Sequence, residues 1–402
     1  MSKDIKTEEM AIFPLEDLPD ELILKVFRSL RTRDLICLGQ MSNRIRAISH
    51  DEQFWQKINL YHDIDSFQQR LKDNMMGQAL LLKTSKSGAG NVTPGPLAPQ
   101  VPTALKRIGK IPASFLNLAI SNGCKYLSLY PYQIDGKLEL NQVSSLVYLK
   151  LHQPKVGYFI NYEIVSVMEE LLTSCDSLQK LSMNSLALSL DMVNIVSNQN
   201  GKTLQVLDLN GCKIAESWEI KLEPVQIIVR NCINLKEVNF DNTILSKEAI
   251  RCLVENVTSS IQVLSLNYVT SVNDLCIRIL VNRCKELKTL NLAHTPITTQ
   301  SLLAIIENLK SSLEQLDIAG TRRISLFTNL LELREMSKLQ IFIGSPPLPI
   351  KKQLQNNSPH LRIYDFGDNE VEHQKFLNEA ISASNKDGIW EIKAEPLKLF
   401  SS

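Results

Sequence analysis

Apolar residues recur along the middle of this chain in a short pattern that returns at a nearly constant distance. Leucine or another apolar residue stands at the first, fourth and sixth positions of segments beginning at residues 178, 204, 235, 261, 287 and 313. Every interval is 26 residues except the one from 204 to 235, which is 31. Such a period indicates a repeat array, in which each unit buries its apolar side against its neighbours.

Within each repeat, two apolar residues flank a single polar one, and this alternation predicts a short strand. The apolar side chains should point into the array and the residue between them should point outward. We expect these outward residues to form the floor of a solvated concave surface, because all are small and polar: Ser182, Asp208, Asn239, Ser265, Asn291 and Asp317.

The segments between the strands carry apolar residues at i, i+3 and i+4 spacing, which predicts helices at 164–172, 247–254, 275–281 and 301–309. These helices should form a convex outer layer over a parallel sheet. The longer interval contains Trp218 and should bulge as a loop. For Trp218 we favour packing on the convex side over an exposed contact.

A different pattern occurs near the N-terminus. Leu18-Pro19-Asp20-Glu21 is a helix start, and apolar residues at helical spacing follow it. Further helices are expected near 33–41 and 43–49, followed by Phe54-Trp55 and an alternating stretch at 58–60. A segment this short cannot bury so much apolar surface alone, so it needs either the rest of the chain or a partner protein.

The order of these features from residue 15 to about residue 60 resembles the F-box, the module by which substrate receptors dock onto the Skp-family adaptor of cullin–RING (SCF) ubiquitin ligases. One departure lies in the third helix. Many F-boxes carry an aromatic residue there, whereas this chain reads Asn43-Arg44-Ile45-Arg46.

The repeats resemble the cysteine-containing leucine-rich repeats that are common in F-box proteins, since Cys175, Cys232 and Cys284 each precede a repeat leucine by three residues. The two resemblances together imply an α+α/β chain, with a three-helix F-box followed by an α/β horseshoe and a C-terminal tail. We expect an arm at 1–14, the F-box at 15–62, a linker region at 63–123 with a flexible insertion at 85–102, repeats at 124–366 and a tail at 367–402.

The tail at 367–402 allows two interpretations. A cap over the exposed end of the repeat array is the plainer one, because a solenoid end needs a cover. A segment that returns along the concave face is the functional alternative.

Composition narrows the possible functions. The chain has 44 Lys and Arg against 43 Asp and Glu, which argues against nucleic acid or an anionic membrane as a partner. No apolar run approaches the ~20 residues of a membrane span, and no secretory signal is visible. None of the 8 cysteines forms a CxxC pair, so buried thiols are favoured over zinc ligands or disulfides.

Catalytic patterns are also missing from the sequence. The 6 histidines show no ligand spacing, and there is neither a glycine-rich phosphate loop nor a nucleophile elbow. We therefore expect a non-catalytic protein without a cofactor. As a receptor of the F-box class it is expected in the nucleus and cytoplasm.

The resemblance implies that the F-box binds the adaptor, and through it the cullin and RING subunits. The alternative is that the same apolar residues only pack against the first repeats. The expected adaptor-binding residues are Leu18, Pro19, Leu22, Ile23, Val26, Phe27, Leu30, Leu35 and Trp55.

The repeats would bind a protein substrate, and residues near the concave strand ends and in the tail are the candidates: Asn210, Asn242, Asn267, His294, Arg322 and Trp390. Arg322 and Arg323 could pair with a phosphate or simply be solvated, so phosphorylation of the substrate stays open. Members of this class that recruit a small kinase-regulatory subunit use aromatic and charged residues just past successive strands. The matching positions here are Asn242, Thr270, His294 and Gly320, so that partner also stays open.

Two other classes of function are compatible with parts of this pattern. One is a scaffold that binds the adaptor without directing ubiquitination. The other is an enzyme in its own right, for which His294 at a concave strand end would be a candidate, although a lone surface histidine is more often a simple contact.

Overall fold

The computed structural model describes residues 15, 18–28, 30, 38, 42–49, 51, 54, 56–59, 111–130, 134–136, 138, 140, 143–152, 162–214, 218–321, 323–324, 327–366, 371–373 and 375–376. The predictions for the arm at 1–14, the insertion at 85–102 and the far tail lie outside these residues. So do those for Leu35, Trp55, Arg322 and Trp390.

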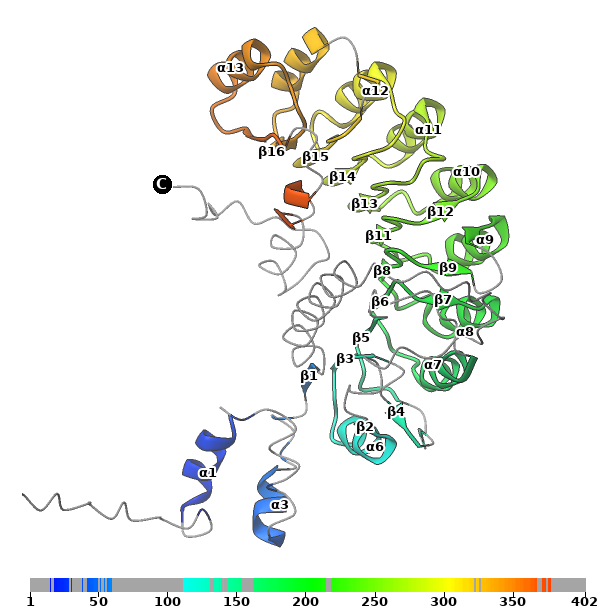
Figure 1. Ribbon diagram of the computed structural model, residues 1–402, viewed down its shortest axis with the longest axis vertical. Coiled ribbons are helices and arrows are strands. Elements are labelled where there is room, and N and C mark those ends of the chain that lie inside the picture. Colours follow the sequence, from blue (N-terminus) through cyan, green and yellow to red (C-terminus); the bar gives the residue numbers. More distant parts are fainter. Residues whose placement is uncertain are drawn as a thin grey trace, which may run out of the picture.

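A parallel sheet of eleven strands lines the inside of a curved array in the described residues, and its strands follow one another in chain order (Figure 1). The predicted repeat strands are confirmed. The strands are β1 (Lys57–Asn59), β3 (Tyr126–Leu129), β5 (Tyr148–His152), β6 (Lys180–Asn184), β8 (Val206–Asp208), β11 (Glu237–Asn239), β13 (Val263–Ser265), β14 (Thr289–Asn291), β15 (Gln315–Asp317), β16 (Ile341–Ile343) and β17 (Arg362–Tyr364).

Helices cover the convex side (Figure 1), and the four predicted ones are all present. Several begin at a side-chain cap: the hydroxyl of Ser246, for example, accepts a hydrogen bond from the Ala249 N–H. The layer consists of α6 (Ala113–Ser121), α7 (Tyr162–Ser174), α8 (Leu190–Asn200), α9 (Leu222–Asn231), α10 (Lys247–Asn256), α11 (Asp274–Arg283), α12 (Thr299–Leu309), the 3-10 helix η4 (Phe327–Glu335) and α13 (Leu348–Asn357).

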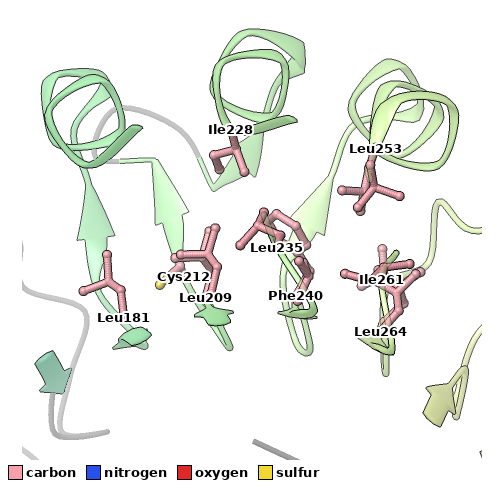
Figure 2. Close-up of a cluster of buried hydrophobic side chains, with 14 of the residues drawn as sticks. Leu181, Leu209, Cys212, Ile228, Leu235, Phe240, Leu253, Ile261 and Leu264 are labelled. Carbon is pink, nitrogen blue, oxygen red and sulfur yellow. The ribbon is translucent and has the colours of Figure 1, made fainter. Parts of the chain in front are cut away.

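Apolar side chains from strands and helices meet in one continuous core between the two layers (Figure 2). Seven cysteines lie in the described residues, and all are buried free thiols, as predicted. Burial raises the pKa of Cys175 to about 12, which keeps this thiol protonated. Cys232 and Cys284 also end α9 and α11, which explains why a small apolar residue recurs three positions before the repeat leucine.

Short two-stranded parallel ribbons flank the main sheet: β2 (Ile111–Pro112) with β4 (Ile134–Asp135), β7 (Ala187–Leu188) with β9 (Lys213–Ile214), and β10 (Glu219–Ile220) with β12 (Ile244–Leu245). Trp218 immediately precedes β10 and is 54% exposed, so the expected packing of this side chain is wrong. Its position at a ribbon end keeps it out of the helix layer. The Lys213 ammonium lies 4.0 Å from its ring centre and covers one face.

The N-terminal module contains α1 (Asp20–Phe27) and α3 (Asn43–Ser49), and α3 has the predicted bounds. Ile23, Phe27 and Ile45 form its fully buried centre, with the Phe54 ring 6.0 Å from that of Phe27. Ile45 is thus the residue by which α3 contributes to this buried centre. The Arg44 guanidinium donates to the Asp20 carboxylate and to the Leu18 carbonyl, which fastens α3 to the start of α1.

The module is joined to the repeats by the sheet itself. Strand β1 pairs in parallel with β3, and the register places Ile58 opposite Leu127. Phe54 contacts both the small core of the module and the main core. Within the described ranges, no helix combines the length and apolar character that crossing a lipid bilayer requires.

Candidate functional site

The first candidate surface is one side of α1. Leu22 is 48% exposed and Val26 is 42% exposed, and the two residues lie one helical turn apart. Pro19, just before the helix, is exposed as well. We call these three residues the α1 ridge. Large apolar side chains at helical spacing and left in solvent are typical of a helix that binds a partner.

The structure divides the predicted adaptor-binding residues of α1 into exposed residues and buried ones. Ile23 and Phe27 are fully buried inside the module, so their assignment to a docking surface is corrected. Consecutive positions on a helix differ by about 100° in direction, which separates the pair at 23 and 27 from the pair at 22 and 26. Leu18 and Leu30 are partly buried and pack against the same small core.

The second candidate surface is the concave face, and its polar residues are not a solvated floor. The residues in the middle of each strand motif are buried, contrary to the expectation from sequence. At four of the six positions, 208, 239, 291 and 317, a side-chain oxygen accepts a hydrogen bond from the backbone N–H two residues further on. In this way Asn239 binds the N–H of Asp241 at 2.8 Å, and Asp317 binds that of Ala319 at 3.0 Å.

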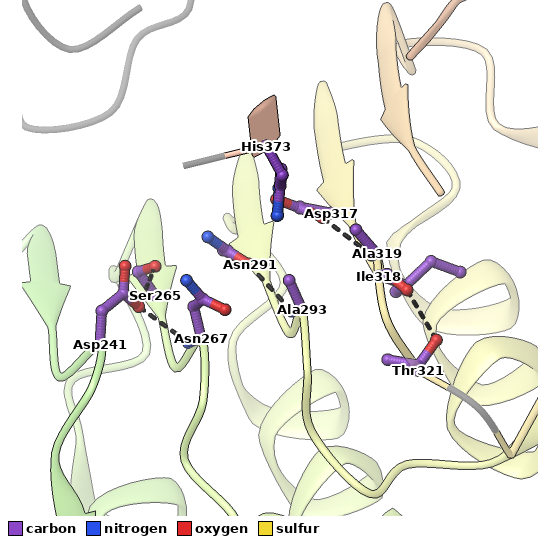
Figure 3. Close-up of polar contacts among 10 residues, drawn as sticks. All are labelled: Asp241, Ser265, Asn267, Asn291, Ala293, Asp317, Ile318, Ala319, Thr321 and His373. Atoms are coloured by element: carbon purple, nitrogen blue, oxygen red, sulfur yellow. Dashed lines mark hydrogen bonds and ion pairs between the residues drawn. The ribbon is translucent and has the colours of Figure 1, made fainter. Parts of the chain in front are cut away.

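This arrangement explains why the middle residue is Asp or Asn in most repeats. The chain turns out of the sheet after each strand, and the N–H two residues on needs an acceptor that the neighbouring strand does not supply. Figure 3 shows the same bond at two repeats, from Asn291 to Ala293 and from Asp317 to Ala319. Small polar residues therefore form turns here.

Ser265 departs from this pattern, and Asp241 of the preceding repeat compensates. One carboxylate oxygen of Asp241 accepts the Ser265 hydroxyl at 2.6 Å and the Asn267 N–H at 2.8 Å (Figure 3). Burial raises the pKa of Asp241 to about 8, against the opposing effect of these hydrogen bonds. Burial also raises the pKa of Asp208. One oxygen of this carboxyl accepts the Asn210 N–H, and the other accepts the Ser182 hydroxyl.

Two residues after each strand motif, the chain adopts a left-handed conformation. The backbone N–H groups of Ser185, Gly211, Asn242, Tyr268 and His294 each donate to a carbonyl of the next repeat; that of His294, for example, reaches the Ala319 oxygen at 2.7 Å. Glycine and Asn tolerate this conformation, whereas bulky residues rarely adopt it. The positions are Ser185, Gly211, Asn242, Tyr268, His294 and Gly320.

Tyr268 and His294 are the unusual members of this row. Their rings stack with centroids 4.2 Å apart and an angle of 4° between their planes. Gly320 makes room for the stack, because a Cβ at that position would lie 2.2 Å from the His294 Nδ1. Backbone strain that is retained for two stacked rings points to a functional edge on this side of the sheet.

The structure brings together four residues that the sequence proposed for substrate binding. Asn210, Asn242, Asn267 and His294 lie at successive strand ends, and the Asn242 amide donates to the Asn210 carbonyl at 3.1 Å. Sequence reasoning missed Tyr268, because it matched Thr270 to this row. Counting two residues past the last apolar residue of each motif would have found it.

Part of the tail returns along the concave face. Residues 371–373 and 375–376 are helical. The His373 Nε2 lies 2.8 Å from an Asp317 carboxylate oxygen, and both side chains are buried (Figure 3). Phe376 is buried in an apolar cluster with Ala293 and Ala319 and the strand residues Val263, Ile341 and Ile343. The described tail therefore follows the concave alternative and does not cap the array.

Comparison with known proteins identifies the first module. Residues 15–61 match the family model described as F-box-like. The N-terminal module is an F-box-like domain. The repeats that follow it form a leucine-rich-repeat solenoid of parallel strands and outer helices. No curated protein matches the chain.

Two solved structures are similar to the chain. One is a Bacteroides fragilis protein with 15% sequence identity and a TM-score of 0.37, covering 55% of this chain and 65% of its own. This chain therefore spans less than two thirds of that protein. The other is a chain of the yeast Rad7–Elc1 complex, with 12% identity and a TM-score of 0.36, covering 63% of this chain and 71% of its own.

In the described part of the chain, no group of three or more His, Cys, Asp or Glu residues is placed to hold a metal ion. Both candidate surfaces present groups that can bind a partner. The F-box-like domain offers apolar contacts, and the concave face offers hydrogen bonds and stacked rings.

Proposed function

We propose that this chain is the substrate receptor of an SCF-type ubiquitin ligase. The α1 ridge would bind a Skp-family adaptor, which connects the chain to the cullin and RING subunits. The repeats would hold a protein substrate. The single observation that supports this proposal most strongly is the match of residues 15–61 to the F-box-like family.

The exposure pattern of α1 supports the same role. Ile23 and Phe27 already fill the core of the module, so its fold does not need Leu22 and Val26 to be buried. Two half-exposed apolar side chains on one helical turn lower the solubility of the protein unless a partner covers them. The flanking charges of Glu21 and Lys25 would form a polar rim around such a contact.

Ubiquitin transfer would depend on proximity alone. The receptor supplies no catalytic group in this proposal, and it raises the local concentration of a substrate lysine near a conjugating enzyme brought by its partners. Residues 330–335, 358–362 and 389–392 resemble S-phase kinase-associated protein two, which marks cell-cycle inhibitors. We extend the proposal to cell-cycle regulators as substrates, and to the nucleus and cytoplasm as the place of action.

A small kinase-regulatory subunit would meet the left-handed row at Asn242, Tyr268, His294 and Gly320. The corrected register puts Tyr268 in the place of Thr270, so the row contains two rings. Such a subunit therefore remains part of the proposal as an accessory that the stacked rings could contact.

A direct test is the substitution Leu22→Asp in the full chain, which places a charge on the α1 ridge. Binding of a recombinant Skp-family adaptor should be lost in a pull-down. Leu275→Asp on α11 is the matched control, because Leu275 is a similarly exposed helical leucine far from the ridge. Unchanged adaptor binding by Leu22→Asp would refute the proposal. Adaptor binding without recovery of a cullin would favour the scaffold function instead.

A further inference from the structure

The concave face changes character between β13 and β14. At the position one residue after each strand motif, the successive repeats carry Asn210, Asp241 and Asn267, and then Ala293 and Ala319. The alanines belong to a second apolar cluster that is separate from the main core. The polar row therefore ends beside an apolar floor on the substrate side of the sheet.

A segment of the same chain already occupies this floor. The ring of Phe376 is buried there, next to Tyr364 with 4.7 Å between ring centroids. His373, one turn earlier, donates to or accepts from the buried Asp317 carboxyl at 2.8 Å. The neighbouring Val371 is 78% exposed, so its side chain lies outside this buried contact.

Two aromatic rings lie close to the His373 ring. The centroid of the His294 ring, which stacks on Tyr268, is 5.8 Å away. The centroid of the Phe366 ring is 5.3 Å away. The site thus has an apolar floor, one carboxyl acceptor, and ring walls that favour a flat or aromatic side chain.

We propose that this concave site binds a protein segment carrying an aromatic side chain and a hydrogen-bond-donating side chain one helical turn apart, and that residues 371–376 occupy it as an internal substitute. The inference rests on the proposed receptor function and names the substrate class of the same surface. The segment His373 to Phe376 shows the spacing that the site accepts.

Two buried polar atoms next to the site explain how an external segment can displace the internal one. The Asn267 side-chain oxygen and the Asn291 side-chain nitrogen have no hydrogen-bond partner in the described part of the chain. One is an acceptor and the other a donor, which together match a backbone amide. A substrate segment that reaches them forms hydrogen bonds that residues 371–376 do not form.

Hydrogen-bond chemistry also limits the ligand. Asp317 is the acceptor within the site. A phosphate presents acceptor oxygens and not the donor that this acceptor needs, so the recognised segment is unphosphorylated at the position corresponding to His373. A histidine, lysine or arginine there fits the acceptor.

The test uses a fluorescent peptide that copies residues 366–380, added to full-length protein. In the wild type, residues 371–376 compete with the peptide for the site. The apparent affinity for the peptide is therefore the intrinsic affinity multiplied by the fraction of molecules whose site is open. Phe376→Ala in the full chain should release the site and tighten peptide binding by about tenfold or more. Val371→Ala is the matched control, because Val371 is exposed, and it should bind the peptide as the wild type does.

The substitution Asp317→Asn tests the contribution of the carboxyl group to peptide binding. Asn stands at the same position at 239 and 291 and accepts the same turn bond there, so this variant keeps the fold. Combined with Phe376→Ala, it should weaken peptide binding by about tenfold. Equal peptide binding by wild type and Phe376→Ala, or no loss with Asp317→Asn, would overturn the inference. Adaptor binding, measured in parallel, would be unaffected and so tests the receptor function separately.

Discussion

The two faces of α1 should separate stability from adaptor binding. Phe27→Ala removes a fully buried ring between Ile23, Ile45 and Phe54. Truncations of this kind cost about 3–5 kcal/mol, which a module of this size cannot absorb. Leu22→Ala with Val26→Ala removes side chains that are already half exposed, so the cost to the free chain is small.

The same double truncation should be costly in the complex. Full burial of such side chains contributes about 1.5–3 kcal/mol each, and about half of that remains to be gained at a partner. The two together give about 2 kcal/mol, or a loss of about 30-fold in adaptor affinity.

Calorimetric titration with the adaptor, together with hydrogen exchange of α1, distinguishes the two effects. Phe27→Ala should raise exchange throughout α1, whereas the double variant should leave exchange unchanged and weaken binding. If the double variant unfolded α1, or if its affinity stayed within about twofold of the wild type, the division of α1 into a core face and a binding face would be wrong.

Two further outcomes follow from the concave face. Gly320→Ala places a Cβ against the His294 ring in a left-handed backbone, so it should break the Tyr268 stack and lower the melting temperature; an unchanged ultraviolet difference spectrum of Tyr268 would contradict this. Asp241 has its folded pKa raised to about 8 from an unfolded value near 4, so its contribution to stability is present at low pH and is lost as pH rises through that window, by at most about 1.4 kcal/mol per unit. Asp241→Asn keeps both accepted hydrogen bonds, and melts from pH 5 to 8 should show a flatter profile than the wild type; parallel profiles would refute the assignment.

The periodic parts of the fold could be predicted from the sequence because the same positions are buried in each repeat and therefore carry apolar residues each time. The spacing of Leu287 and Leu290 placed β14, and the helical spacing at 301–309 placed most of α12. The buried thiols followed from the absence of ligand spacing. These features depend on local periodicity, which a sequence displays directly.

Other parts depend on contacts that periodicity does not show. Asn239 and Asp317 are buried because an N–H beyond the strand needs an acceptor, and the alternation of polar and apolar residues predicts only that they leave the core. Trp218 is exposed because it precedes a ribbon. The site of Phe376 depends on two alanines more than fifty residues earlier, and single-residue patterns carry no signal for such a pair.

For the candidate site, the positions of Asn242 and His294 could be predicted and their neighbour Tyr268 could not, since the register slipped by two residues at one repeat. The sequence predicted the candidate adaptor residues on α1 only as one group. Their separation into Leu22 and Val26 on one side and Phe27 on the other required knowing which side α3 covers.

The parallel sheet fixes the distance between the F-box-like domain and the stacked rings. Strand β1, at the end of this domain, is the first strand of the sheet and pairs with β3, and the rings of Tyr268 and His294 lie just beyond the ends of β13 and β14. Seven strand steps of about 4.8 Å separate β1 from β14, or roughly 34 Å of arc. Under the proposed function, the distance between adaptor and substrate is therefore set by the number of repeats, and deleting one repeat would shorten it by one strand spacing without changing either binding surface.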